Sequence, residues 1–181
     1  MGYDFYLIKP SPERDRTIPI DYFLTEAELN VGEPSPEIEM HKKAFAEVLL
    51  RECSSLTRDE PRFDEIAKRE NLTLMEAQKR FRQIELRSLT PDLGITISIY
   101  DELVFVSMAW WEHLEDREKA VTEAWKCLTA IQEISGYEIY DIQRSRRLDI
   151  SKDRNSVLEV YNEGTRLAAS VSPNLFLKHH R

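Results

Sequence analysis

The feature that most constrains the fold is a continuous pattern of strand, turn, strand, long helix and strand. Apolar and polar residues alternate over 94–100, and an apolar run follows at 103–111, with only Asp101-Glu102 between them. Two residues are enough to join antiparallel strands in a hairpin. A helical apolar stripe covers 115–134, and a third strand pattern occupies 137–142. The crossover through this helix should place 137–142 in the same sheet as the hairpin.

The N-terminal and C-terminal parts of the chain add one strand and two helices. Residues 3–8 are rich in aromatic and branched side chains, which is typical of a strand. Residues 20–29 suggest a short helix, and 154–170 suggest a final helix that contains Gly164. We expect a flexible tail over 173–181.

Three further helices are expected over residues 36–87. Residues 36–54 carry apolar side chains at helical spacing, behind a Ser-Pro start that suits a helix N-terminus. Residues 61–70 also look helical. Thr73 and Glu76 have the spacing of a capping box, which predicts a further helix over 74–87.

Together these elements predict an α+β protein with a single domain over residues 1–172. We expect helix 115–134 to pack on an antiparallel sheet, with a helical insertion over 36–87. The sheet should hold about four strands, at 3–8, 94–100, 103–111 and 137–142.

Composition limits the classes of protein that this chain can belong to. Its hydrophobic fraction of 41% and charged fraction of 32% are those of a globular protein. A formal net charge of -8 opposes non-specific binding to nucleic acid. No apolar run reaches the roughly 20 residues that span a bilayer. We expect Cys53 and Cys127 to be buried, free thiols, and we place the protein in the cytoplasm.

The sequence lacks the motifs of several common chemistries. Its five glycines lie far apart, so no glycine-rich loop can cradle a phosphate, and we expect no cofactor. The sequence contains no HExxH and no CxxC, so we expect no metal site. It also contains no Gly-x-Ser-x-Gly elbow. A thiol nucleophile paired with His113 has no local support. We expect no catalytic residues.

Tyr-Asp recurs at the ends of predicted strands. One interpretation is structural, because Asp favours turns and Tyr suits a half-buried sheet position. The functional interpretation is a polar binding edge, where these pairs converge at one rim of the sheet. Its members would be Tyr100, Asp101, Tyr140, Asp141 and Gln143.

The adjacent Trp110 and Trp111 form a second candidate for partner binding. Neighbouring strand residues point to opposite faces, so both cannot enter the same core layer. Segment 103–111 is apolar on both faces, which indicates either a strand covered on both sides or an exposed aromatic face. The two tryptophans are therefore either helix-covered packing or an anchor for a partner.

Residues 64–87 resemble a DNA-binding helix-turn-helix. Asn71 replaces the usual turn glycine, while Glu70 stands where an apolar residue is expected. Segment 62–87 holds seven basic and five acidic residues. Its basic side chains would form either a nucleic-acid contact or a solvated helix face. The candidates for such a contact are Lys79, Arg80, Arg82 and Arg87.

Three segments carry a resemblance to a group of uncharacterised bacterial proteins: 2–8, 81–86 and 136–143. The group often has Tyr-Asp-Pro-Gln where this chain has Tyr-Asp-Ile-Gln at 140–143. This resemblance implies no activity and no catalytic residues. The chain is also similar in size, acidity and α+β layout to immunity proteins of bacterial toxin systems.

These observations favour a non-enzymatic cytoplasmic protein that binds another protein, as an immunity-like inhibitor or a regulator. Two alternatives stay open. One is nucleic-acid binding through 64–87, and the other is an enzyme with a polar site at the sheet rim.

Overall fold

A computed structural model of the chain describes residues 2–10, 33–90, 93–110 and 114–171. Within these residues, seven strands form one sheet in the order β2-β3-β4-β5-β1-β6-β7, and all neighbours are antiparallel. The strands are β1 (Gly2–Ile8), β2 (Leu56–Asp59), β3 (Ile84–Ser88), β4 (Ile95–Ile99), β5 (Leu103–Ala109), β6 (Glu138–Asp141) and β7 (Arg146–Arg147).

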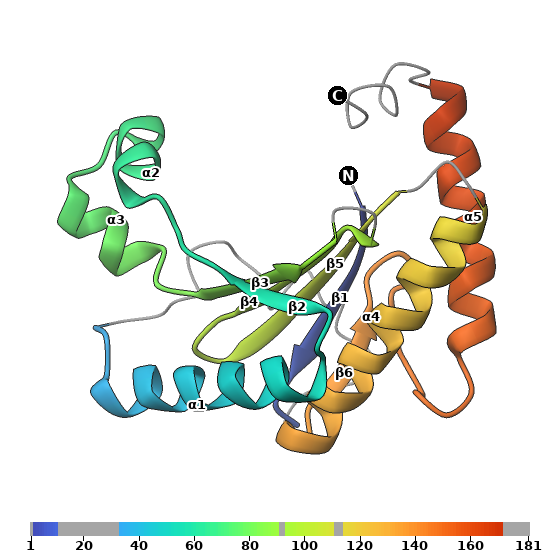
Figure 1. Ribbon diagram of the computed structural model, residues 1–181, viewed down its shortest axis with the longest axis horizontal. Helices are drawn as coiled ribbons and strands as arrows, with labels where there is room; N and C mark the ends of the chain where they lie inside the picture. The colour runs from blue at the N-terminus through green and yellow to red at the C-terminus, as the bar shows by residue number, and fades with distance from the viewer. Residues whose placement is uncertain (1, 11–32, 91–92, 111–113, 172–181) are drawn as a thin grey trace.

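Five helices accompany the sheet in the described part of the chain: α1 (Pro36–Glu52), α2 (Phe63–Glu70), α3 (Leu74–Arg80), α4 (Leu114–Ser135) and α5 (Arg154–Val171). Helices α1, α4 and α5 line one side of the sheet, while α2 and α3 form a hairpin that projects beyond β2 and β3 (Figure 1). The molecule therefore has a helical layer, a sheet layer and a small helical projection.

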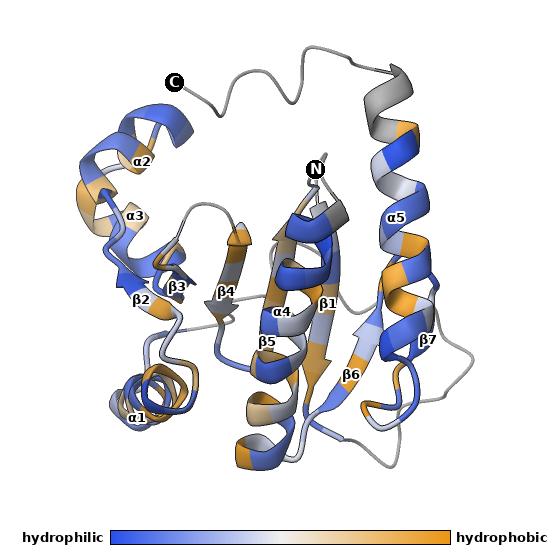
Figure 2. Cartoon of the chain, turned by 45° about the vertical axis from the view of Figure 1, so that its right-hand side comes forward, coloured by the Kyte–Doolittle hydropathy of each residue, from blue (hydrophilic) through white to orange (hydrophobic). Residues whose placement is uncertain are grey.

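The long crossover has the topology that the sequence predicts. β1 pairs with β5 on one side and with β6 on the other, so α4 carries the chain from β5 across β1 to β6. β5 and β6 run parallel to each other, because both are antiparallel to β1. Figure 2 shows α4 lying in front of β1 and β5, with α5 beside β6 and β7.

The main core lies between the sheet and the helical layer. Along β1, Tyr3, Phe5 and Leu7 are fully buried, whereas Asp4 and Tyr6 are half-buried. This alternation follows from the period of two in a strand, which sends successive side chains to opposite faces. We call the face that carries Tyr3, Phe5 and Leu7 the covered face. The opposite face, on which α1, α4 and α5 do not pack, we call the open face.

Several sequence predictions are confirmed. Asp101 and Glu102 form the two-residue connection between β4 and β5, closed by the Tyr100 N–H donating to the Leu103 carbonyl at 2.9 Å. Thr73 and Glu76 form the capping box at the start of α3. Asn71 adopts the left-handed conformation, with φ of 54°.

The predicted sheet was too small, and the predicted insertion was not purely helical. The sheet has seven strands in the described residues, not four, since β2 and β3 lie within 36–87 and β7 follows β6. The helix expected over 74–87 ends at Arg80. Ile84 and Leu86 instead alternate along β3 and face Ile99 and Ile97 of β4. The apolar spacing in this short segment fits either a helix or a strand, and pairing with β2 and β4 favours the strand.

The α2–α3 hairpin contributes little to the core. Ala67 and Ala77 are buried in it, but Leu74 and Met75 are 52% and 77% exposed. The helical spacing of Leu74, Ala77 and Ile84 in the sequence predicts that Leu74 is buried, and this prediction is wrong. Met75 and Leu74 begin a short α3 that stands away from the sheet (Figure 1).

Some predictions fall on residues that the structure does not describe: the short helix over 20–29, Trp111, and the tail over 173–181. Among the described helices, none combines the length and the apolar character needed to cross a membrane.

Candidate functional site

The open face is built from alternate residues of neighbouring strands that lie in register. Tyr140 of β6 faces Tyr6 of β1, Tyr6 faces Phe105 of β5, and Phe105 faces Ser98 of β4. Ser98 in turn faces Glu85 of β3. Residues directly opposite in antiparallel strands point to the same side, so this row crosses five strands of the open face.

Aromatic side chains occupy the middle of this face. The Tyr6 and Phe105 rings lie 5.1 Å apart between centroids, at an interplanar angle of 43°. Tyr140 lies next to Tyr6 in register, and Tyr100 follows Ser98 by two residues, directly after the end of β4. All four rings are half-buried. We call Tyr6, Tyr100, Phe105 and Tyr140 the aromatic patch.

A carboxyl group lies at one side of the aromatic patch. The Ser98 hydroxyl donates to Glu85 Oε2 at 2.7 Å. Burial raises the pKa of the Glu85 carboxyl above its usual value, and hydrogen bonds from Ser98 and Gln83 oppose that shift. Burial and the nearby Glu85 carboxyl raise the pKa of the Tyr100 hydroxyl. Glu85 therefore occupies a partly desolvated position beside aromatic rings.

Ion pairs flank the aromatic patch. Arg147 Nη1 lies 2.6 Å from Glu138 Oε1, and the Tyr140 hydroxyl donates to Glu138 Oε2 at 3.0 Å. At the other end of the row, Arg87 Nε lies 3.5 Å from Asp59 Oδ1. The strand residues of the open face carry four carboxylates and two guanidinium groups, so its net charge is negative. These residues are Asp4, Asp59, Glu85, Glu138, Arg87 and Arg147.

Asp101, which the sequence nominated as a binding residue, lies in a buried ion cluster. Its Oδ1 is 2.9 Å from Lys42 Nζ, and its Oδ2 accepts a hydrogen bond from Arg82. Lys42 Nζ also lies 2.8 Å from Glu39 Oε1. The side chains of Lys42, Asp101 and Arg82 are 3%, 4% and 7% exposed. This cluster fixes α1 and the start of β3 to the β4–β5 turn.

Asp141, another candidate binding residue from the sequence, is also buried and hydrogen-bonded. Its Oδ2 accepts from the Tyr3 hydroxyl at 2.6 Å, and its Oδ1 accepts from the Arg144 N–H at 3.1 Å. Burial raises the pKa of the Asp141 carboxyl, although these hydrogen bonds oppose the shift. Burial and Asp141 together raise the pKa of Tyr3.

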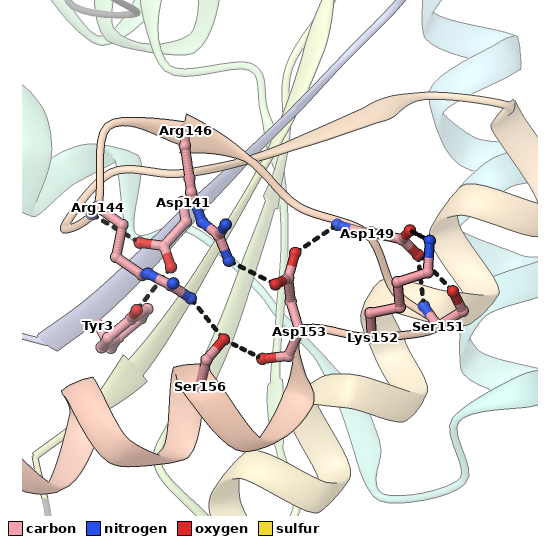
Figure 3. Close-up of polar contacts among 9 residues, drawn as sticks. All are labelled: Tyr3, Asp141, Arg144, Arg146, Asp149, Ser151, Lys152, Asp153 and Ser156. Carbon is pink, nitrogen blue, oxygen red and sulfur yellow. Dashed lines mark hydrogen bonds and ion pairs between the residues drawn. The ribbon is translucent and has the colours of Figure 1, made fainter.

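Further polar contacts extend from Asp141 to the start of α5 (Figure 3). The Arg144 guanidinium donates to Ser156 Oγ at 2.6 Å, while Arg146 pairs with Asp153. The Asp153 carboxylate also accepts from the Asp149 N–H at 2.8 Å. These contacts hold the β6–β7 turn against the N-terminus of α5, so a structural role accounts for them.

The expected convergence of the Tyr-Asp pairs on one rim does not occur. Asp101 lies at the sheet end where β1 reaches Ile8, because Ile8 faces Leu103. Gln143 lies at the opposite end, where its amide oxygen accepts from the Asp4 N–H at 3.1 Å. Tyr100 and Tyr140 do share the open face. The strand alternation that sends both tyrosines to this face sends Asp141 to the covered face.

Trp110 belongs to the covered face. Its ring stacks on Tyr161 of α5 with centroids 5.0 Å apart and an angle of 20°. It also meets Tyr3 edge-on at 5.9 Å, and Gly164 lies directly against it. Packing under a helix is therefore the interpretation that fits Trp110. Trp111 lies outside the described residues.

The four basic residues of the helix-turn-helix hypothesis do not share one helix. Lys79 and Arg80 lie in α3, and Lys79 pairs with Glu33. Arg82 follows the end of α3 and enters the buried ion cluster. Arg87 lies on β3 and pairs with Asp59 on the open face. Nucleic-acid binding through this segment stays a prediction. The structure does not place its four basic residues on one continuous helix.

The sequence nominated Tyr100 and Tyr140 but missed Tyr6 and Phe105. For each of these two residues, the sequence carried one indication of its position on the open face. Tyr6 follows Asp4 by two residues, on the polar side of the alternation in β1. Phe105 falls in a strand that is apolar on both faces, which indicated an exposed aromatic face as one alternative.

No group of three or more His, Cys, Asp or Glu side chains is placed to hold a metal ion among the residues that the structure describes. Comparisons with protein-family models, with curated protein sequences and with solved structures found no match to this chain.

Proposed function

We propose that this chain is a non-enzymatic binding module that recognises another protein through the open face, as an immunity-like inhibitor or a regulator. The observation that supports the proposal is the aromatic patch. Four half-buried rings, three from different strands and the fourth directly after β4, lie on the side of the sheet that α1, α4 and α5 leave uncovered. Aromatic residues are enriched in the energetically dominant parts of protein interfaces.

The shape and chemistry of the open face favour a protein over a small molecule. Small-molecule sites are usually concave, with a few polar groups converging on the ligand. The aromatic patch instead follows a row of strands, and its polar neighbours pair with one another, as in Glu138 with Arg147. A row of this kind suits a broad contact with a polar rim.

Charge favours a basic partner. The strand residues of the open face carry an excess of carboxylates, and the whole chain has a formal net charge of -8. Such a field attracts a basic protein over long distance and raises the rate of association. Acidic inhibitors of basic proteins use this steering, so we propose a basic protein as the occupant of the open face.

Photo-crosslinking tests this proposal directly. A photoreactive phenylalanine analogue at Phe105 samples the aromatic patch, and the same analogue at Met40, which is 64% exposed on α1, is the matched control. In the native host, irradiation of the Phe105 variant should yield one discrete adduct with a basic protein. The Met40 variant should yield no such adduct.

Salt and substitution then separate a specific complex from chance capture. The adduct yield at Phe105 should fall as ionic strength rises, because salt screens long-range attraction. Replacing Tyr140 with Ala should reduce the yield, whereas replacing the exposed Leu167 of α5 should leave it unchanged. Equal adducts from Phe105 and Met40, or none from Phe105, would rule the proposal out.

A further inference from the structure

β2 is an end strand of the sheet, and its outer edge is unpaired in the described part of the chain. Its strand neighbour there is β3, and α1 runs beneath it (Figure 2). The Leu89 N–H donates to the Ser55 carbonyl at 2.7 Å, in the same register that pairs Thr57 with Arg87. Hydrogen-bonded pairs alternate with non-hydrogen-bonded pairs along antiparallel strands. The N–H and C=O of Thr57 therefore point to β3, whereas those of Arg58 point outward.

Three backbone groups of this edge are open to a further strand. The Leu56 N–H turns back to the Cys53 carbonyl at 3.0 Å. The Leu56 carbonyl and both backbone groups of Arg58 have no partner among the described residues. Unpaired N–H and C=O groups along an edge are a template for another strand. An extended peptide that runs antiparallel to β2 would bond to all three groups.

One flank of α1 lies beneath this edge. Arg58 faces the buried Leu86 of β3 across the strand pair, so its side chain lies on the covered face. There its Nη2 lies 3.0 Å from Glu47 Oε1 of α1. Side chains three and four residues apart share one side of a helix. This spacing places three exposed residues on the same flank as Glu47: Met40, Lys43 and Arg51.

The charges beneath the edge favour an acidic peptide. Of the five residues, Lys43, Arg51 and Arg58 are basic, and Glu47 is acidic, so this surface is net positive in a chain whose formal net charge is -8. Lys43 and Arg51 form no ion pair with another described residue. The Nε of Arg58 is buried and has no hydrogen-bond partner in the same part of the chain. An acidic side chain opposite Arg58 would complement these cations.

A second copy of this chain would fit the edge less well than an acidic strand. In the symmetric register that joins two Arg58 residues through their own N–H and C=O groups, the two Arg58 side chains stand directly opposite each other. Like charges at such positions destabilise a strand pair. A short edge strand with charged residues also resists indiscriminate pairing. The edge therefore favours a strand that presents a carboxylate to Arg58.

We propose that the outer edge of β2 is a second binding site, which takes an extended acidic segment of a partner as an added antiparallel strand. Backbone hydrogen bonds supply affinity in this mode of recognition, and alternate side chains supply specificity. The carboxylate of the segment lies opposite Arg58, and an apolar side chain on the same side of the segment contacts Met40, which is 64% exposed. The site uses the edge of the sheet and α1, so it does not depend on the open face.

The test uses the isotope-labelled full chain and a capped peptide, Thr-Val-Thr-Glu-Thr-Val-Thr, in which Val and Glu share one side. Titration with this peptide should shift the backbone amide resonances of β2 and α1 and leave those of Tyr6 and Phe105 unchanged. A peptide with Lys in place of Glu should bind about tenfold more weakly, because it repeats the charge of Arg58. Methylating the amide nitrogen of that Glu should have an effect of similar size, because it removes the donor to the Arg58 carbonyl.

Substitutions at the edge separate its backbone from its side chain. Arg58→Pro removes the outward N–H but keeps the bonds between β2 and β3, since an edge strand accepts proline where the N–H faces away from the sheet. It should weaken binding of the Glu peptide about tenfold or more. Arg58→Ala keeps the N–H, so it should bind the Glu and Lys peptides with similar affinity. Arg87→Ala, on the open face, is the matched control and should bind as the native chain does. Unfolding midpoints check that each variant is folded.

Three outcomes would overturn the proposal: no shift of the β2 resonances at millimolar peptide, equal affinity for the methylated and unmethylated peptides, or a dimer of the free chain that forms through β2 and assigns the edge to a second copy.

Discussion

The two faces of the sheet hold different aromatic groups although they are built from the same strands. On the covered face, Tyr3 and Phe5 are fully buried and their rings lie 5.2 Å apart. On the open face, Tyr6 and Phe105 lie at nearly the same spacing but stay half-buried. Neighbouring residues of β1 therefore lie in different environments. Stability should depend on the covered face, and we expect binding to depend on the open face.

The largest effect on stability is expected from a matched pair of side-chain truncations, one on each face of the sheet. Phe5→Ala removes a fully buried ring and should lower the free energy of unfolding by about 3–5 kcal/mol. Phe105→Ala removes a half-buried ring from the open face and should cost about 1 kcal/mol. Urea denaturation of the three proteins measures both losses. Equal losses would contradict the division between the two faces.

A second pair of variants compares a buried ion pair with an exposed ion pair on the open face. Asp101→Ala would remove a carboxylate that pairs with two buried cations, Lys42 and Arg82, and should cost about 3 kcal/mol. Asp59→Ala breaks a pair whose side chains are 48% and 59% exposed, and should cost less than about 1 kcal/mol. Urea midpoints give the comparison, and a loss below about 1 kcal/mol for Asp101→Ala would show that the buried ion cluster is not structural.

Local patterns were predictable because their causes lie within a few residues. The capping box of Thr73 and Glu76 satisfies backbone N–H groups at its own helix end. The Asp101-Glu102 turn joins strands that are adjacent in the sequence. The alternation over 94–100 predicted β4, since the buried face of a strand has a period of two.

Distant pairing was not predictable in the same way. Ile84 and Leu86 form a strand only because β4 and β2 lie on either side of β3. Asp101 looks like a turn residue in the sequence, and nothing near it points to Lys42. The aromatic patch likewise requires the order of β6, β1 and β5, which places Tyr140 beside Tyr6 and Tyr6 beside Phe105.

A smaller effect is expected where α5 closes over Trp110. A methyl group on Gly164 would lie 2.5 Å from Cη2 of the stacked Trp110 ring. Gly164→Ala should therefore cost about 1–2 kcal/mol, despite the better helix propensity of Ala. Thermal unfolding of this variant measures the cost. A rise in the unfolding midpoint would mean that α5 packs loosely enough on the covered face to accept a methyl group beside Trp110.

The smallest effect concerns Asp141, a buried carboxyl of the covered face that accepts from the Tyr3 hydroxyl and the Arg144 N–H. Burial raises the folded-state pKa of Asp141 above its unfolded value, so the folded protein holds this proton more tightly. The contribution of Asp141 to stability is thus complete below the unfolded pKa of about 4, and it is lost as pH rises through the folded pKa.

Asp141→Asn removes that titration while keeping a shape that can still bond to its neighbours. The Asn oxygen can accept from the Arg144 N–H, and its amide can donate to the Tyr3 hydroxyl oxygen. Relative to the native protein, the variant should gain stability between about pH 4 and neutral pH, by about 1 kcal/mol or less because hydrogen bonds offset most of the burial cost. Urea titrations at several pH values measure the difference. If the native protein instead gains on the variant as pH rises, nearby charge rather than burial controls the pKa of the Asp141 carboxyl, and the expected direction is wrong.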